Sequence, residues 1–336
     1  MSKERVFQEK DFELIGIQED ANKAEKDITP SFWKDAYIRF KSNKVAMIGL
    51  IMVIIIILFA IFAPMLSSRA YDSVQTAHQN LPPRVPILEN IGILNGHING
   101  VDVYASKGLG DISYLFGTDT LGRDLWVRVW EGTRISLFVA CAAVIIDILF
   151  GMTYGLISGY FGGKVDNIMQ RIQEIVNSIP SLVVLTLLLL VMEPSLNTII
   201  IALMITGWVG MSRVTRAEVL KLKEQEFILA SKTLGASHFF ILMKEIIPNI
   251  FGQIIIMSMF SIPNAIFYEA FLAFVGLGIP APAASLGALI NDGFESFAIY
   301  PHMVVIPVVV LAILMLSFNM LADGLRDAFD PKQKKM

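Results

Sequence analysis

The sequence predicts an all-α polytopic membrane protein with six transmembrane helices, and three observations support this fold class. Of the 336 residues, 54% are hydrophobic and only 17% are charged, whereas soluble domains carry about 25% charged residues. Six long apolar runs alternate with polar segments, and none shows the period-two alternation of a lipid-facing strand. Lys and Arg are also segregated along the chain, as they are in membrane proteins of fixed orientation.

The first element is a polar tail, residues 1–44, followed by an apolar run. The tail lacks the apolar stretch and small-residue cleavage site of a secretory signal. Its last part, Ser31 to Lys44, interleaves aromatic and basic residues, which is typical either of an interfacial helix or of a basic flank that only sets orientation. Val45–Leu66 carries no charge, and as a helix of about 33 Å it would cross a hydrocarbon core of about 30 Å.

Residues 67–131 form a polar segment punctuated by Pro82, Pro83, Pro86 and several glycines, so we expect a small external insert. Five further apolar runs follow and are predicted to be helices. They lie near Ile135–Phe161, Ile175–Met192, Leu196–Met211, Ile246–Gly276 and Tyr300–Leu321.

The positive charges predict the orientation of these helices. No Lys or Arg occurs between Lys244 and Arg326, whereas the 212–247 loop and the tail 326–336 are basic. Because Lys and Arg mark the inside face, the N- and C-termini and this loop are expected in the cytoplasm. Residues 132–325 then form the membrane core that contains the loop.

Several kinds of site find no support in the sequence. The single cysteine, Cys141, excludes an intrachain disulfide, and the four histidines lie too far apart for metal-ligand spacing. Ser158 to Val165 superficially resembles a phosphate-binding loop. It has Ser158 where the first glycine belongs and Val165 where a magnesium-binding Ser or Thr belongs, so no nucleotide site is expected.

The segment Arg216 to Ile250 predicts a helix, a tight turn and a second helix. Gly235 stands where a helix C-terminus requires a left-handed backbone, Ser237 can cap the next helix, and Pro248 marks the start of the following span. The first helix has a common face formed by Lys223, Phe227, Ala230 and Leu234. Periodicity alone leaves two interpretations: a docking element for a cytoplasmic partner, or a solvated basic loop.

This loop resembles the motif of ABC-importer permeases, in which a Glu-Ala-Ala run precedes a glycine and an Ile-x-Leu-Pro ending. Ala230, Gly235 and Pro248 match in identity and spacing, while four positions depart from the motif: Leu229, Ser231, Glu245 and Ile247. Four blocks resemble the second of the two paired subunits of oligopeptide, dipeptide and nickel permeases, namely Phe116–Leu137, Ser158–Arg171, Phe267–Gly278 and Phe318–Pro331.

The resemblance implies a type I ABC importer permease fold in the bacterial cytoplasmic membrane, without catalysis or a cofactor of its own. It implies a paralogous permease subunit, two cytoplasmic ATPase subunits that hold ATP and Mg²⁺, an external peptide-binding protein and membrane lipid as partners. No nucleic acid is expected. The implied ATPase-coupling residues are Glu226, Phe227, Ala230, Ser231, Leu234, Gly235, Ala236, Ser237 and Pro248.

Few ionisable residues fall within the predicted spans: Asp147, Glu269 and, near one end, Asp323. A charge in hydrocarbon costs at least about 2.5 kcal/mol, so such groups usually face a cavity or a partner. Asn264 and Tyr268 share a helical face, with Glu269 rotated from it. One hypothesis is that these three residues line the translocation path. The alternative is that Glu269 makes an interhelical hydrogen bond or is protonated.

Rival functions predict features that the sequence lacks. A secondary transporter predicts internal repeats, an intramembrane enzyme a His-Glu-x-x-His or Gly-x-Ser-x-Gly motif, and an ion channel a filter sequence. Within the resembled family, the long insert Leu81–Gly108 looks most like the oligopeptide kind, with dipeptide or nickel as alternatives. The segment Ala281–Phe297 is expected to face outward, toward the binding protein.

Overall fold

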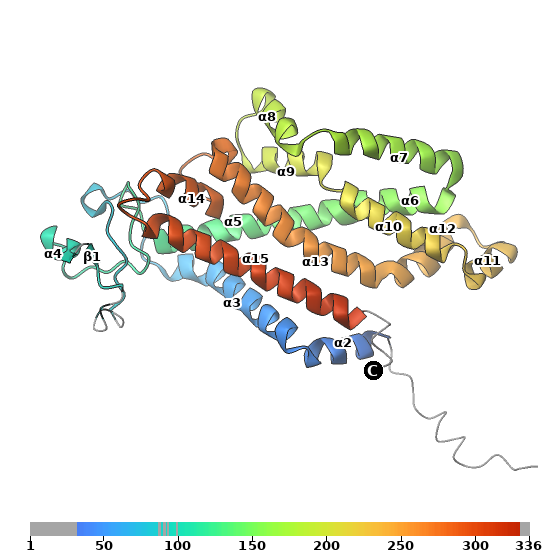
Figure 1. Cartoon of the computed structure of the whole chain (residues 1–336), viewed down its shortest axis with the longest axis horizontal. Coiled ribbons are helices and arrows are strands. Elements are labelled where there is room, and N and C mark those ends of the chain that lie inside the picture. The colour runs from blue at the N-terminus through green and yellow to red at the C-terminus, as the bar shows by residue number, and fades with distance from the viewer. Residues whose placement is uncertain (1–31, 87–88, 90–91, 93, 99, 330–336) are drawn as a thin grey trace, which may run out of the picture.

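The computed structural model describes residues 32–86, 89, 92, 94–98 and 100–329, so the predicted tails lie partly outside the described residues. The described chain is a bundle of long helices (Figure 1). Its helices are α2 Phe32–Ser42, α3 Lys44–Leu66, α5 Leu125–Ile146, α6 Thr153–Phe161, α7 Gly163–Ser178, α8 Ser181–Val191, α9 Leu196–Thr206, α10 Val209–Leu222, α11 Glu226–Thr233, α12 His238–Phe240, α13 Ile247–Leu272, α14 Leu286–Phe294 and α15 His302–Phe329.

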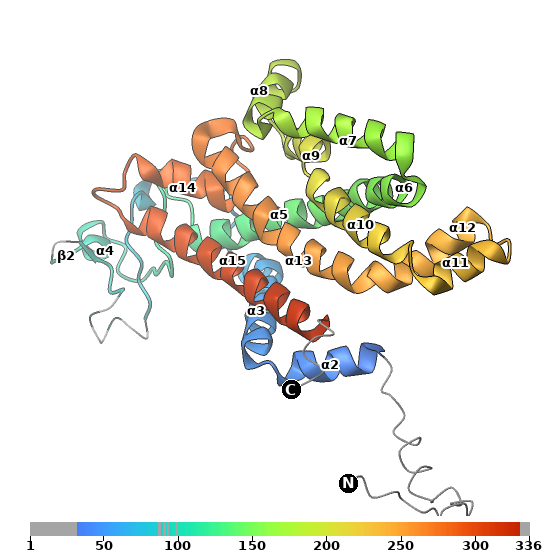
Figure 2. The same ribbon diagram turned by 45° about the vertical axis from the view of Figure 1, so that its right-hand side comes forward.

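Three π-helical segments continue these helices: η4 Asp147–Met152, η5 Ile241–Ile246 and η6 Ala273–Leu277. Different segments of the chain lie at the two ends of the bundle. We call the end with residues 67–124 and α14 the insert end, and the end with residues 223–240 the hairpin end (Figure 2).

Within the described residues, five helical stretches are long and apolar enough to cross a membrane, and a bent pair of helices makes a sixth candidate. The five are 44–66, 125–161, 196–222, 238–277 and 302–329. They confirm the predicted helical polytopic fold, although most extend beyond the apolar runs. The reason is that hydropathy marks only the part of a helix that needs lipid, while polar residues can continue the same helix into water.

The predicted third span, Ile175–Met192, is wrong as a single helix. α7 and α8 meet at a bend of 76°. Pro180 disfavours the helical conformation of the residue before it, and Ile179 is extended, with φ −86° and ψ 120°. α8 alone, with 11 residues, is only about 16 Å long, too short to cross the hydrocarbon core.

The first span starts at Lys44 because Asn43 caps it. The Asn43 side chain accepts hydrogen bonds from the backbone N–H groups of Val45 and Ala46. α3 then packs closely along α15: a Cβ added at Gly49 would lie 2.8 Å from Met320 Cβ. The predicted helix before this span is present as α2, whose Trp33 ring contacts the Phe329 ring edge to face.

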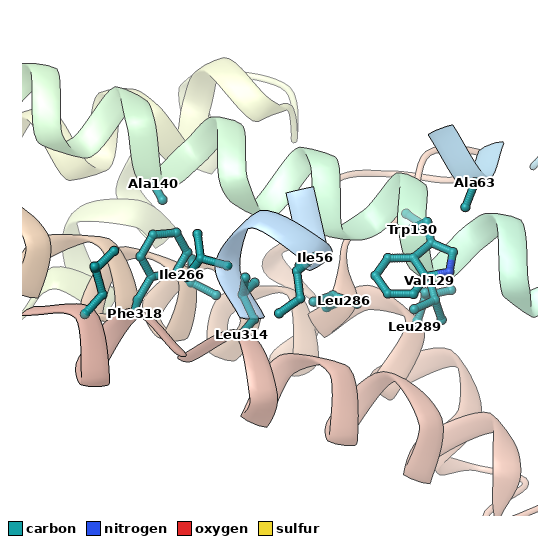
Figure 3. Packing of buried hydrophobic residues seen from close by; sticks show 13 residues of the cluster. Ile56, Ala63, Val129, Trp130, Ala140, Ile266, Leu286, Leu289, Leu314 and Phe318 are labelled. Atoms are coloured by element: carbon teal, nitrogen blue, oxygen red, sulfur yellow. The ribbon is translucent and has the colours of Figure 1, made fainter. Parts of the chain in front are cut away.

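The main hydrophobic core joins α3, α5, α13, α14 and α15 (Figure 3). Aromatic rings fill its insert end, where Phe59 of α3 stacks on Trp130 of α5 with centroids 4.9 Å apart. The buried members are Val53, Ile56, Ala63, Val129, Trp130, Ala140, Ile266, Ala284, Leu286, Leu289, Leu314, Phe318 and Leu321. Two helices of this core, α5 and α13, also border the cavity described below.

Glycines bring α6 and η4 against α10. Gly151, Gly155 and Gly159 recur every four residues, so they share one helix face. A Cβ at Gly155 would lie 2.4 Å from the Ser212 carbonyl oxygen and 2.7 Å from Thr215 Cβ. The two backbones therefore approach as closely as small residues allow, a packing mode common between membrane helices.

The insert has elements and a core of its own. These elements are η2 Thr76–His78, β1 His97–Ile98, β2 Val101–Asp102 and α4 Val103–Ser106. Buried Leu81, Tyr104 and Tyr114 form the core, and Tyr104 donates a hydrogen bond to the Pro82 carbonyl at 2.8 Å. Burial and the charges of Arg69 and Lys107 lower the pKa of His78. The insert ends earlier than the predicted residue 131, because Asp124 caps α5.

Candidate functional site

The hairpin end carries a helical hairpin, which we define as residues 223–240. Its first helix, α11, is connected to the second by a turn whose Gly235 has φ +83°. Ala236 N–H donates to the Ser231 carbonyl at 3.0 Å and Gly235 N–H donates to the Lys232 carbonyl at 3.0 Å. These two bonds form a Schellman motif, which needs a left-handed residue at Gly235. Ser237 Oγ accepts from Phe240 N–H and caps the second helix.

Contacts with α6 hold the hairpin in place. Ile228 is fully buried in a cluster of apolar side chains from α6, α10 and η5. The Tyr160 hydroxyl of α6 lies 2.9 Å from His238 Nδ1, and Lys223 Nζ donates to the Gly159 carbonyl at 3.0 Å. These contacts attach the hairpin directly to α6. Neither Ile228 nor Tyr160 was predicted from the sequence as a contact of the hairpin.

The outer side of the hairpin exposes apolar side chains. Leu234 is 88% exposed at the turn and Phe239 is 73% exposed just after it. Phe227, Leu229, Phe240 and Met243 add further exposed apolar surface. We call these six exposed side chains the apolar patch. Exposed apolar surface of this kind commonly marks a protein-interaction site.

The structure brings together most of the predicted coupling residues, from Glu226 to Ser237, in this hairpin. Pro248 is separate: it lies inside the continuous helical stretch 238–277, about 15 Å along the axis from His238. Pro248 is the second residue of α13, where the predicted following span begins, and π-helical η5 joins this helix to the hairpin without a break. Lys223 is also outside α11, so the predicted common face does not include it.

Two positions that depart from the resembled motif contact each other. Ser231 Oγ in α11 donates a hydrogen bond to Glu245 Oε1 in η5 at 2.5 Å. Neither residue is fully exposed. The bond therefore joins the two helices of the hairpin across the turn.

We expect Ser231→Ala to loosen the hairpin without unfolding the protein. A hydrogen bond to a charged group contributes about 1.5–3 kcal/mol when buried, and partial exposure reduces this to about 1 kcal/mol. Amide hydrogen exchange in α11 should then be about fivefold faster, with α15 unchanged. Thr233→Ala is the matched control, because the Thr233 hydroxyl bonds only to Leu229 of its own helix. Equal effects of the two substitutions would show that the bond across the turn is unimportant.

A second candidate site is a cavity of about 310 Å³ between α5, η4, α8, α9, α10 and α13. Polar side chains from several elements face it, while much of its wall is apolar. The polar ones are Asp147, Ser181, Thr206, Ser261, Asn264 and Tyr268. We call this space the interhelical cavity. Two of the three predicted path residues, Asn264 and Tyr268, line it.

Glu269 lies elsewhere. Its side chain is fully buried and does not line the interhelical cavity. Its Oε2 accepts a hydrogen bond from the Ser136 hydroxyl of α5 at 2.9 Å. This interhelical bond is the alternative raised by the sequence, and in this conformation Glu269 joins α13 to α5.

At the insert end, charged residues connect α14 to the start of α5. Asp292 of α14 lies 3.5 Å from Arg128 and 3.8 Å from Arg123, and Arg123 also pairs with Asp119 at 2.6 Å. α14 contains most of the segment that was expected to meet an external binding protein. It and the insert lie at the same end of the bundle (Figure 1).

Two family models match the sequence. Residues 151–335 match the model of binding-protein-dependent transport system inner membrane components. Residues 31–83 match the N-terminal transmembrane domain of oligopeptide transport permease C.

Curated relatives align over nearly the whole chain. The oligopeptide transport system permease protein OppC of Bacillus subtilis is 45% identical over 94% of this chain and 94% of its own length. The dipeptide transport system permease protein DppC of Lactococcus lactis is 43% identical over 96% and 97%. OppC of Escherichia coli is 38% identical over 90% and 92%.

Among solved structures, a chain of the MetNI methionine ABC transporter in an inward facing conformation aligns with a TM-score of 0.49 and 16% identity. The alignment covers 60% of this chain and 97% of that chain.

Proposed function

The chain belongs to the family of binding-protein-dependent transport system inner membrane components, and from this premise we propose that it is one permease subunit of an ATP-driven peptide importer. The observation that carries the proposal is the similarity to peptide permeases along nearly the whole chain. Oligopeptides are the preferred cargo, because the first span and its flank match the oligopeptide permease model. Dipeptides are the second candidate, supported by the 43% identical relative.

The hairpin is proposed to dock into a groove on a cytoplasmic ATPase subunit. Its exposed apolar patch offers the contact surface, and its attachment to α6 offers a route by which ATPase closure moves the helices. Glu226 to Ser237 supply this element, and Pro248 lies in the helical stretch 238–277 that follows it. The chain itself is proposed to be non-catalytic and to bind no cofactor, with ATP and Mg²⁺ on two partner ATPases.

The protein is a multi-pass protein of the bacterial cytoplasmic membrane, and we propose that its hairpin end faces the cytoplasm. The Lys and Arg distribution supports this orientation, since residues 245–325 contain none. The insert end, with α14, then faces outward and would meet the peptide-binding protein. A paralogous permease completes the channel, and Asn264 and Tyr268 contribute to its path.

The test is uptake by cells that lack only this chain. A labelled dipeptide, a pentapeptide and nickel ion are supplied before and after the wild-type gene is restored. We expect pentapeptide uptake to be lost and then recovered, at least tenfold above background. Recovery of dipeptide alone would favour the second candidate, and recovery of nickel alone would contradict peptide transport by this chain.

A further inference from the structure

Asp147 is a carboxylate without a countercharge at the centre of a predicted span. It is 6% exposed and lines the interhelical cavity, whose lining contains no other charged side chain among the described residues. The Ser261 hydroxyl is its hydrogen-bonding neighbour. We propose that Asp147 forms a subsite in this cavity for a cationic group of the cargo, specifically the amino-terminal ammonium of a peptide. The inference rests on the proposed peptide importer.

The local backbone places this carboxylate at the cavity. Asp147 is the first residue of the π-helical η4, where the helix widens between α5 and α6. Single π-turns inside α-helices are rare and frequently occur at functional sites. Here the widened turn begins at the cavity wall, and Gly151 then brings the same segment against Trp208 and Met211 of the α10 region.

Electrostatics favour a cationic ligand. An ionised carboxylate buried at membrane depth is costly unless a charge or strong donors face it, and a peptide ammonium is costly there for the same reason. Pairing removes part of both costs. Every peptide with a free amino terminus carries this ammonium whatever its side chains, so one carboxylate can serve many sequences.

The rest of the cavity suits the end of a peptide. Its volume of about 310 Å³ is at the lower limit of ligand pockets, enough for a terminal residue rather than a whole chain. The Tyr268 hydroxyl is buried, and the Ser181 hydroxyl in the same cavity lining is its polar neighbour. It is available to the first peptide group of the ligand, and the exposed Asn264 amide lies on the same helix face.

The other carboxylates of the predicted spans differ from Asp147. Glu269 is occupied by Ser136 and is away from the cavity. Asp323 is exposed on α15 near the hairpin end and does not line the cavity either. This difference provides a control that changes the same chemical group at another place.

The experiment uses the complete importer with its binding protein in lipid vesicles. Transport of a pentapeptide with a free amino terminus is compared with that of its N-acetylated form. Asp147→Asn should lower transport of the free peptide about tenfold, equivalent to about 1.4 kcal/mol, and change the acetylated one less than twofold. Asp147→Glu, which keeps the charge, and Asp323→Asn should stay within about threefold of wild type for both peptides.

Three outcomes would overturn the subsite. Asp147→Asn could transport the free peptide at the wild-type rate, it could lower transport of both peptides equally, or Asp147→Glu could be as impaired as Asp147→Asn. If the wild type does not transport the acetylated peptide, the test of the subsite is the transport rate of the free peptide by Asp147→Asn compared with that by Asp147→Glu. A wild-type importer that moves no peptide refutes the proposed function itself, and the subsite with it.

Discussion

Gly155→Leu is expected to prevent the protein from accumulating in folded form. A Cβ at this position would lie 2.4 Å from the Ser212 carbonyl oxygen and 3.0 Å from Arg216 N, both of them backbone atoms of α10 that cannot rotate away. Overpacking of a core typically lowers the stability of the folded state by about 1–3 kcal/mol. Because the added side chain would clash with the backbone of α10, we expect a loss of about 3 kcal/mol or more. The measurement is the yield of monodisperse protein after mild detergent extraction, which should fall at least tenfold.

Separation of α6 from α10 would also disrupt the ionic contact beside the glycines. Arg216 of α10 donates two hydrogen bonds, each 2.6 Å, to the two carboxylate oxygens of Asp166 in α7, and Ser158 of α6 donates a third at 2.6 Å. This bidentate pair needs α7, which directly follows α6, at its present distance from α10. Gly155→Leu therefore removes packing and ion pairing together.

The control for this prediction is Gly110→Ala, compared with Gly155→Ala. A Cβ at Gly110 meets no atom of the described chain within 4 Å, and its φ is not in the left-handed region. The alanine change should therefore be nearly neutral at position 110 and clearly destabilising at position 155. Normal yield of Gly155→Ala would mean that α6 and α10 are not held together as the structure has them.

The helical polytopic fold was predictable because lipid imposes a strong constraint on sequence. A run such as 45–66, without a charge, has no stable alternative to a helix in hydrocarbon, and α3 covers it with a difference of one residue. The bend between α7 and α8 was harder to predict from the sequence. Hydropathy counts Ile175 toward a span, while the structure has it in an amphipathic helix that ends before Pro180.

The candidate sites show the same contrast. The turn at Gly235 could be predicted, because a left-handed residue at a helix C-terminus strongly favours glycine. The interhelical cavity could not, since Asp147, Ser181 and Tyr268 are brought together only by packing of distant helices. Helical periodicity gives the direction of Glu269 relative to Tyr268 on the same helix. It cannot show that the Ser136 hydroxyl of another helix donates a hydrogen bond to Glu269.

Gly235→Val is expected to abolish most peptide uptake while the protein remains inserted and folded. Gly235 has φ +83°, a conformation that costs an L-residue about 1–2 kcal/mol and a β-branched residue more. The two bonds of the Schellman motif depend on this conformation, so the turn should rearrange. Leu234 and Phe239, which flank the turn, would then be displaced from their positions in the apolar patch.

Because the space around Gly235 is open, the expected effect of Gly235→Val comes from the backbone conformation alone. No described atom would lie within 4 Å of a Cβ at this position, so valine creates no clash within the chain. We expect uptake to fall about tenfold or more, with a matching loss of ATPase subunits that copurify. The yield of monodisperse protein should be unchanged, because Ile228 and its cluster remain in place.

Gly235→Asn is the matched control, because asparagine adopts the left-handed conformation more readily than other residues that carry a Cβ. It adds a side chain of similar size to valine, yet should keep uptake within about threefold of wild type. If both variants lost uptake equally, side-chain bulk in the ATPase contact would be responsible rather than the backbone of the turn. If both kept it, the hairpin would not be the element through which ATP hydrolysis drives transport.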